Sequence, residues 1–226
     1  LMLVDDRGIQ ALLKEVQSES LVVALKGAKP ELRDRILKNM STRAAETLKE
    51  ELDSRGPLAE RDADRGAVYY ARADGSMIRE AVFPLERPNG IGLSPDGHTL
   101  YVVETPTARC WSFKLSGPGE IESANGPYRG EKGTVVVGLG GYQMFDSLAV
   151  DAEGHVCVAT LITGAVSDIW PDGSRVDQYM LPDMMVTNVC FGGPELRTAF
   201  ATLSMGGTLV SFDWPRPGLP LNYLNR

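Results

Sequence analysis

Hydrophobic and polar residues follow two different periods along this chain. Up to about residue 57, apolar residues recur at intervals of three and four, as they do on one face of an α-helix. Three such sets are Ile9, Leu12, Leu13 and Val16; Leu32, Ile36, Leu37 and Met40; and Ala44, Ala45, Leu48 and Leu52. Pro30 suits the first turn of the second helix, Ser41 is a good N-cap for the third, and Gly56-Pro57 ends it. We therefore predict a small all-α N-terminal segment of three or four short helices.

After residue 65 the period changes to short β-branched or aromatic runs separated by D-G or G-G pairs, a pattern typical of strands and turns. The runs are 67–71, 78–83, 99–104, 109–115, 134–139, 155–161 and 208–214. The charge density changes as well, because residues 1–62 hold 23 charged side chains and 3 glycines, whereas 63–226 hold 30 and 21. We predict a mainly β chain with a helical segment at 1–57, a linker or splice at 58–65 and a β domain at 66–226.

The β part contains an internal repeat. The stretch D-G-S-M-I-R-E-A-V-F-P-L-E-R-P-N-G-I-G (74–92) parallels D-G-S-R-V-D-Q-Y-M-L-P-D-M-M-V-T-N-V-C (172–190). Likewise S-P-D-G-H-T-L-Y-V-V-E-T (94–105) parallels residues 151–160 and 193–202. A four-strand unit that recurs at about 40 to 57 residues is typical of β-propeller blades. We expect about three blades and a leading pair of strands.

Composition narrows the classes of partner and compartment. The net charge of −7 and the pI near 5.0 argue against a nucleic-acid or anionic-membrane surface. No window approaches 18 consecutive apolar residues, and the first residues do not read as a signal peptide. We therefore expect a cytoplasmic protein without membrane insertion.

The cysteines and histidines offer no clear metal site. Cys110, Cys157 and Cys190 are odd in number and far apart, and each lies in an apolar run, so we expect three buried thiols. His98 and His155 both follow a D-G or E-G turn, and nothing acidic or thiolate recurs around them at metal-ligand spacing. We expect both histidines to be exposed turn residues.

The motifs P-N-G-I-G-L-S-P-D-G-H-T-L-Y-V-V-E-T, F-D-S-L-A-V-D-A-E-G-H-V-C-V-A-T, T-N-V-C-F-G-G and D-W-P-R-P-G-L-P-L-N-Y occur in this order after residue 66. Through them the chain resembles the SMP-30/gluconolactonase family of six-bladed propellers. The resemblance implies hydrolysis of a sugar lactone with one divalent cation, held by a Glu, an Asn and an Asp, with another Asn at the substrate. Asn89 in R-P-N-G matches the Asn ligand, and Asp146 in F-D-S-L matches the Asp that serves as ligand and proposed base.

An Asn carbonyl and an Asp carboxylate suit a hard cation such as Ca²⁺, and Zn²⁺ is the alternative. The corresponding position of the third blade is near Thr187 and Asn188, which we expect to line the pore. The alternative is a purely structural role, in which Asn89-Gly90 is a turn dipeptide and Asp146 caps a turn. The family's Glu and substrate Asn lie on N-terminal blades, where this chain has the helical segment instead. One hypothesis is that two copies of three blades close a six-bladed ring as a homodimer.

The N-terminal segment has its own resemblance. The phrases V-D-D-R-G-I-Q-A-L-L-K-E-V, L-V-V-A-L-K-G-A and N-M-S-T-R-A-A-E-T-L-K-E-E-L-D-S-R-G-P (about 3–57) resemble the C-terminal domain of the flagellar motor switch protein FliG. In that family a charged ridge meets the stator protein, and the matching charges are Lys26, Arg43, Glu50 and Glu51. The alternative is that these are solvated helix faces. The family continues beyond G-P-V-R-L into further helices, whereas this chain gives G-P-L-A-E-R-D.

Three functions remain open from the sequence. The first is a sugar-lactone hydrolase that depends on a divalent metal, or an inactive remnant of one. The second is a protein-interaction module of the flagellar motor switch type. The third is a recombined chain without a function of its own.

Overall fold

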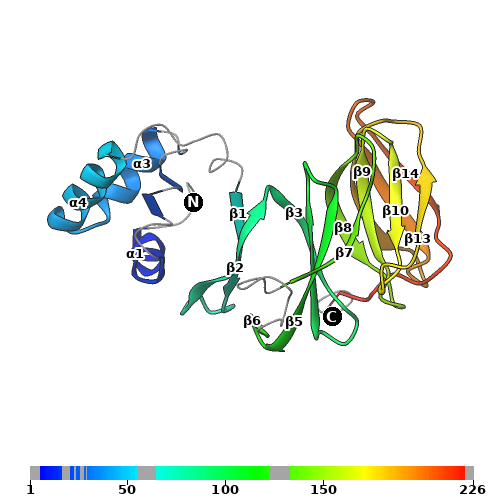
Figure 1. The fold of residues 1–226 in the computed structure, drawn as a ribbon, viewed down its shortest axis with the longest axis horizontal. Coiled ribbons are helices and arrows are strands. Elements are labelled where there is room, and N and C mark those ends of the chain that lie inside the picture. The colour runs from blue at the N-terminus through cyan, green and yellow to red at the C-terminus, as the bar shows by residue number, and fades with distance from the viewer. Residues whose placement is uncertain are drawn as a thin grey trace. The chain divides into compact units, whose positions relative to one another are not determined.

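The computed structural model describes residues 6–16, 21, 22, 24, 25, 28, 30–54, 65–122 and 133–221 (Figure 1). Contacts divide the chain into two compact units, Leu1–Pro84 and Leu85–Arg226. None of the described helices is both long and apolar enough to cross a membrane. The predicted linker falls almost entirely outside the described residues, as does Lys26.

The helices α1 (Asp6–Glu15), α3 (Pro30–Lys38) and α4 (Thr42–Ser54) lie in the first unit. Pro30 begins α3, and the Ser41 hydroxyl accepts a hydrogen bond from the backbone N–H of Ala44 at 3.3 Å, so both predicted helix starts are confirmed. The apolar stripes meet in one buried cluster, to which Ile9, Ile36, Leu48 and Leu52 contribute. Tertiary burial is what stabilises helices this short.

A pair of strands, β1 (Arg65–Ala71) and β2 (Ile78–Glu86), follows the helices and forms a two-stranded sheet. In the turn between them, Asp74 accepts a hydrogen bond from the backbone N–H of Ser76 at 2.9 Å, and Gly75 has φ +73°. Only glycine adopts that φ without strain, so the D-G-S sequence determines the turn.

In the described residues of the second unit, the strands form three antiparallel sheets. The first sheet contains β3 (Pro88–Leu93), β4 (Thr99–Glu104), β5 (Arg109–Gly117), the short β6 (Glu120–Ile121) and β7 (Thr134–Gly138), which pairs with β5. The second sheet has the order β8 (Met144–Val150), β9 (Val156–Leu161), β10 (Ala165–Ile169) and β11 (Val176–Met180). The third sheet contains β12 (Val186–Gly192), β13 (Thr198–Leu203) and β14 (Thr208–Asp213).

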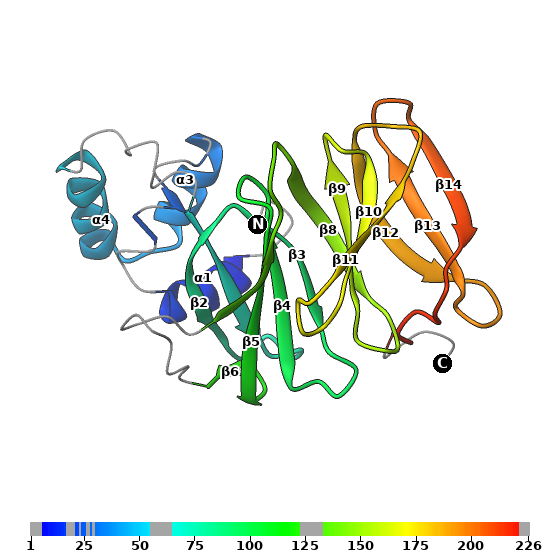
Figure 2. The same cartoon turned by 45° about the vertical axis from the view of Figure 1, so that its right-hand side comes forward.

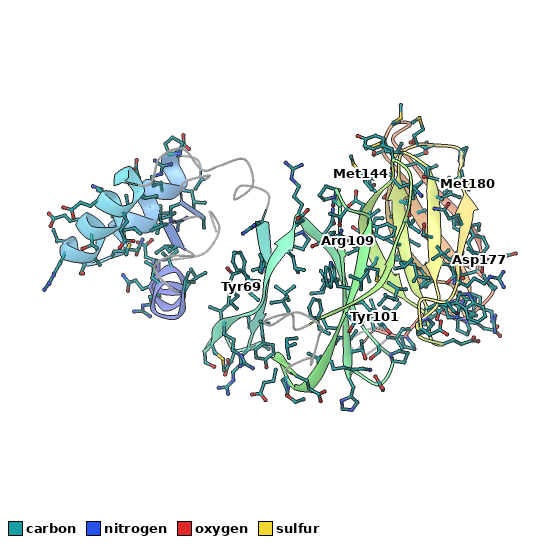
Figure 3. The ribbon with its side chains drawn as sticks, viewed as in Figure 1. Tyr69, Tyr101, Arg109, Met144, Asp177 and Met180 are labelled. Carbon is teal, nitrogen blue, oxygen red and sulfur yellow. The ribbon has the colours of Figure 1, made fainter. Side chains whose placement is uncertain are left out.

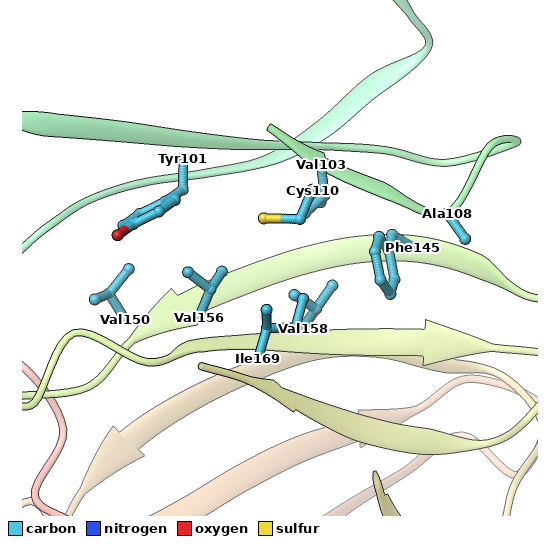
Figure 4. Packing of buried hydrophobic residues seen from close by; sticks show 9 residues of the cluster. All are labelled: Tyr101, Val103, Ala108, Cys110, Phe145, Val150, Val156, Val158 and Ile169. Carbon is cyan, nitrogen blue, oxygen red and sulfur yellow. The ribbon is translucent and has the colours of Figure 1, made fainter. Parts of the chain in front are cut away.

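The second sheet lies between the other two, because β8 contacts both β3 and β12 (Figure 2). Apolar residues of the first and second sheets face each other, with Tyr101 and Cys110 opposite Val156 and Ile169 (Figure 4). A second cluster joins the second and third sheets, and Trp214 packs there against Tyr179 with ring centroids 4.7 Å apart. Successive sheets packed face to face confirm the expectation of a mainly β chain; the number of blades stays a prediction.

The turns repeat as the sequence predicted. Asp96 and Asp172 each accept a hydrogen bond at 3.0 Å from the backbone N–H two residues later, and each is followed by a glycine of positive φ. The prediction of three buried cysteines is wrong in one case. Cys110 and Cys157 are buried, and burial raises the pKa of Cys110 to about 12, but Cys190 is exposed. Its strand, β12, belongs to the third sheet, and the described part of the second unit packs no further sheet against its outward face.

The packing of β3 on β8 provides a stability test. A Cβ added at Gly90 would lie 2.6 Å from the backbone nitrogen of Leu148, whereas one added at Gly140 would have nothing within 4 Å. We expect Gly90→Ala to lower the free energy of unfolding by about 1–3 kcal/mol through overpacking, and Gly140→Ala by less than about 0.5 kcal/mol.

Urea unfolding followed by tryptophan fluorescence measures the difference, because all three tryptophans lie in the second unit. Equal midpoints for the two variants would contradict the close approach of β3 and β8.

Candidate functional site

The first strands of the first two sheets approach each other closely. At Gly90 the missing side chain leaves room for the β8 backbone, since a Cβ there would lie 2.8 Å from the carbonyl oxygen of Asp146. At Gly92 a Cβ would instead meet the side chains of Leu148 and Val150. Strands β3 and β8 therefore run in the same direction. Asn89 and Asp146, each near the start of its strand, are therefore neighbours.

Hydrogen bonds hold Asn89 between two sheets. Its side-chain amide donates to the Thr105 hydroxyl at 3.3 Å, and it lies near enough to the Asp146 carboxylate to lower the pKa of that group. The carbonyl of Thr105 in turn accepts the backbone N–H of Phe145 at 3.3 Å. The loop that follows β4 thus fixes the position of both predicted ligands.

Burial and hydrogen bonding act in opposite directions on Asp146. The carboxylate is half-buried, and this loss of hydration raises its pKa above the ordinary value, while hydrogen bonds from Asn89 and from the Ser147 backbone partly offset the rise. Within the part of the chain that the structure describes, no Lys, Arg or His forms an ion pair with Asp146. A partly desolvated carboxylate without a cationic partner, beside an amide, fits a divalent cation.

A buried carboxylate supports this loop. Glu104 is 2% exposed and accepts hydrogen bonds from the backbone N–H of Glu86 and from the Thr107 hydroxyl, both at 2.7 Å. Sequence reasoning missed Glu104 and Thr105 as parts of the site. The available signal was the polar pair E-T directly after the apolar run Y-V-V, because a charged residue that ends a buried strand needs partners.

Thr187 and Asn188 lie near the start of β12, where the repeat predicts them. Their polar groups are engaged locally: the Asn188 side-chain oxygen accepts the backbone N–H of Val189 at 2.8 Å, and the hydroxyls of Thr187 and Thr202 lie 2.9 Å apart. Among the described residues, no hydrogen bond joins either of them to Asp146. Their lining of a pore stays a prediction.

A second set of charges is buried between the second and third sheets. The Arg216 guanidinium donates to Asp151 through Nε and to Asp168 through Nη2, and its plane lies over the Trp214 ring at 5.9 Å. Asp168 also contacts His155 Nδ1 at 2.8 Å. Burial alone would lower the pKa of Arg216, but its hydrogen bonds to Asp168 and Asp151 raise it above the ordinary value. These ion pairs hold the segment after β14 against the second sheet.

His155 corrects one prediction. Its side chain is 8% exposed and packs on Trp170 at 5.1 Å, so it is a buried residue and not an exposed turn residue. The turn prediction failed because the partners of this histidine come from β10 and the residues after it.

The same region contains an acidic cluster that could hold a metal. The ligand atoms of Asp151, Cys157 and Asp168 lie within 4.8 Å of one another. However, Arg216 already contacts both carboxylates, and burial holds the pKa of Cys157 well above its usual range, which disfavours the thiolate that a metal requires. Both carboxylates of the cluster are therefore already paired with Arg216, whereas Asp146 has no cationic partner among the described residues.

The predicted charged ridge of the helical segment is described in part. Arg43 and Glu50 are exposed on α4 and Glu51 is half-buried. Arg43 and Glu51 border a surface pocket of about 320 Å³ with an apolar floor that includes Leu21, Ala44 and Leu48. The structure thus brings two of the four predicted residues to one concave surface.

Comparisons with known proteins give two separate matches. Residues 52–205 match the model of the SMP-30/Gluconolactonase/LRE-like region, and residues 1–67 match that of the FliG C-terminal domain. The chain is 29% identical over 159 residues to the diisopropyl-fluorophosphatase of Loligo vulgaris, which covers 68% of this chain and 48% of that protein. It is 58% identical over 55 residues to the FliG of Pseudomonas aeruginosa, covering 24% of this chain and 16% of that protein.

A solved structure agrees in fold with the β part. The calcium-binding protein regucalcin from Agrobacterium tumefaciens superimposes with a TM-score of 0.55 at 23% identity, covering 69% of this chain and 54% of that one. The chain thus spans about half the length of the propeller proteins that it matches and a smaller share of FliG.

The buried guanidinium provides a test of the second charge network. We expect Arg216→Met to lower the free energy of unfolding by about 3–5 kcal/mol, because it leaves two buried carboxylates without a partner. Arg175→Met, which removes a surface pair with Asp177, is the matched control and should cost less than about 1 kcal/mol. Equal unfolding midpoints in urea for the two variants would show that Arg216 does not compensate these charges.

Proposed function

The chain belongs to the SMP-30/gluconolactonase/LRE-like family, and on this premise we propose that its β part is a divalent-cation-dependent hydrolase of sugar lactones. One observation carries the proposal. Asn89 and Asp146 come from two sheets and lie far apart in sequence, yet the close approach of β3 to β8 at Gly90 makes them neighbours, and no cation within the described residues neutralises the carboxylate.

The donor set indicates which cation would bind. Asn89 and Asp146 offer oxygen atoms only, and oxygen ligands favour Ca²⁺ over Zn²⁺, which prefers nitrogen and sulfur. When bound, the cation would polarise the lactone carbonyl. The side-chain carbonyl oxygen of Asn89 would face the ion, while its amide nitrogen keeps the hydrogen bond to Thr105. The Thr105 hydroxyl would thus orient the side chain that binds the cation.

The reaction adds water across the ester bond. Asp146 would accept the proton of the attacking water, the ring C–O bond would break, and the proton would pass to the leaving alkoxide to give the open hydroxy acid. Partial burial favours this role, because a less hydrated carboxylate is a stronger base. Glu104 and Thr105 would serve as positioning residues, since they hold the loop that carries the hydrogen-bond partner of Asn89.

The ligand set of one chain is small. Two protein ligands are fewer than the three that the family resemblance implies, and the counterpart of the family's Glu has no match in this sequence. We expect weak cation binding by a single copy, because affinity for Ca²⁺ rises with the number and charge of the oxygen ligands.

The proposed function predicts a metal-dependent activity that one substitution removes. We expect Ca²⁺ to support hydrolysis of gluconolactone and Asp146→Asn to reduce kcat/KM at least about 100-fold, since it removes an anionic ligand and the base together. Asp177→Asn, on the surface of β11, is the control and should keep the activity.

The assay is proton release measured with and without EDTA, together with thermal unfolding at increasing Ca²⁺. If Ca²⁺ gives neither turnover nor a rise in unfolding temperature in the unmodified protein, the lactonase proposal is wrong.

The helical segment supports a second candidate function, a protein-interaction module of the FliG type. The supporting observation is the pocket of about 320 Å³ on α4, in which an apolar floor lies between Arg43 and Glu51. A partner with apolar side chains flanked by charges of both signs would fit such a surface. The flagellar stator protein is the partner that the resemblance implies.

This second candidate predicts a charge-reversal effect. We expect Arg43→Glu to weaken binding of a stator cytoplasmic loop by about tenfold or more, and the loss to shrink at high salt as the charges are screened. Lys49→Glu, which changes the same charge on α4 away from the pocket, is the control. Binding by isothermal titration that is absent, or equal in the two variants, would exclude this module. Absence of both activities would favour a recombined chain without a function of its own.

A further inference from the structure

The strand that carries Asp146 is irregular at that residue. Strand β8 begins at Met144 (Figure 3), and its pairing with β9 changes register between Phe145 and Leu148. Two residues of β8, Asp146 and Ser147, therefore lie opposite a single residue of β9 and form a β-bulge. A bulge leaves its residues without regular ladder partners and changes the direction of their side chains. The ladder with β9 alone does not fix the position of Asp146, so the residues just before the bulge become important.

Gln143, the residue before β8, is held by hydrogen bonds of its side chain. Its Oε1 accepts from the Thr163 hydroxyl and from the Gln178 side-chain amide, both at 2.9 Å. Its Nε2 donates to the carbonyl oxygen of Gly140 at 2.7 Å. Thr163 lies in the connection between β9 and β10, and Gln178 lies on β11, the last strand of the sheet. Gln143 thus joins the start of β8 to the outer strands of the second sheet.

The hydrogen bonds continue from Gln178 into the core. The Gln178 amide also donates to the Ser167 hydroxyl at 3.1 Å, so both of its hydrogens are used. The hydroxyls of Ser167 and Thr160 lie 2.7 Å apart, and Thr160 donates to the carbonyl oxygen of Val158 at 3.1 Å. Ser167 and Thr160 are fully buried. Burying hydroxyls costs free energy unless they are hydrogen-bonded, and a network in which they are is rigid. The rigid interior of the sheet therefore extends to Gln143.

Phe145 connects this anchor to Asp146. Its side chain is fully buried in the cluster between the first and second sheets (Figure 4), and its backbone N–H donates to the Thr105 carbonyl at 3.3 Å. Gln143 holds the same segment from the side of β10 and β11. The chain therefore enters the bulge from a position that is fixed on two sides.

We infer that Gln143 is a positioning residue for Asp146, an inference that rests on the proposed lactonase function. Gln143 acts through the backbone that connects it to Asp146 and sets the direction in which β8 enters the bulge. This direction decides where the Asp146 carboxylate lies relative to Asn89 and to the reacting water. Displacing a reacting group by about 1 Å can reduce a rate about 100-fold, so a loosened strand start lowers turnover although every catalytic group is present.

The first test measures hydrolysis of gluconolactone by the full-length protein at saturating Ca²⁺. Gln143→Met keeps the length of the side chain but removes its hydrogen bonds, so we expect kcat to fall about tenfold while KM changes less than about twofold. Thr163→Val removes one donor to Gln143 and should lower kcat about threefold, whereas Thr163→Ser keeps the hydroxyl and should recover the original rate. Ser174→Ala removes a hydroxyl that donates to Asp172 in the β10–β11 turn, and as the control it should keep the activity.

A second readout does not depend on activity. Hydrogen exchange of the Phe145 backbone N–H, measured by NMR relative to the amides of β9, reports how firmly the start of β8 is held. We expect Gln143→Met to accelerate this exchange about tenfold and Ser174→Ala to leave it unchanged. Equal exchange in the two variants would show that Gln143 does not hold the strand.

The two readouts separate this inference from the proposed function. Faster exchange at Phe145 in Gln143→Met, in a protein without Ca²⁺-dependent turnover, supports the anchoring of β8 and contradicts the lactonase proposal. Turnover that Gln143→Met leaves unchanged supports the lactonase proposal and overturns the positioning role. Faster exchange with a lower kcat, a constant KM and recovery in Thr163→Ser supports both. Equal losses of kcat in Thr163→Val and Thr163→Ser would indicate packing instead of hydrogen bonding and would overturn the inference.

Discussion

The contact of β3 with β8 at Gly90 is the constraint on which the site depends. The two backbones approach to a distance that excludes even a methyl group, so residues on either side of the contact become neighbours although the sequence separates them widely. This approach places the amide of Asn89 beside the carboxylate of Asp146 and lets the Thr105 loop reach both. A larger residue at position 90 would part the sheets where the polar residues meet. The close approach at Gly90 therefore determines both how the two sheets pack and where the polar side chains lie.

The buried pair Asp151 and Asp168 differs from Asp146 in how the negative charge is balanced. Asp151 and Asp168 are almost fully buried, and the Arg216 guanidinium contacts both, so each carboxylate has a cationic partner within the chain. Asp146 is half-buried, and its described partners are an amide and a backbone N–H, which leave its negative charge in place. On the proposed function, a cation from solution would gain more at Asp146, because there it would not have to displace a guanidinium. Proximity of ligand atoms alone points to Asp151, Cys157 and Asp168, whose two carboxylates Arg216 already contacts.

Features of this fold that depend on neighbouring residues could be predicted from sequence, and features that depend on distant ones could not. The Ser41 cap and the Asp96 and Asp172 turns are local, so the residue types fix them. His155 follows a turn of the same kind but is buried, because its environment is made by Asp168 and Trp170. The motif predicted Asn89 and Asp146, whereas for Glu104 the sequence offered only a polar pair after an apolar run, and the fold supplied its two hydrogen-bond donors.

The hairpin β1–β2 lies along the chain between the helices and the three sheets. The helices bury their apolar stripes in a cluster of their own, drawn from residues 9 to 52, and need no β residue for it. The three sheets bury theirs in two further clusters that contain no helical residue. Between them lies a strand pair that carries the repeat of the propeller but has, among the described residues, only two of a sheet's strands. Such a pair gains little stability by itself, so the strands that would complete its sheet are the part of the propeller repeat that the described residues lack.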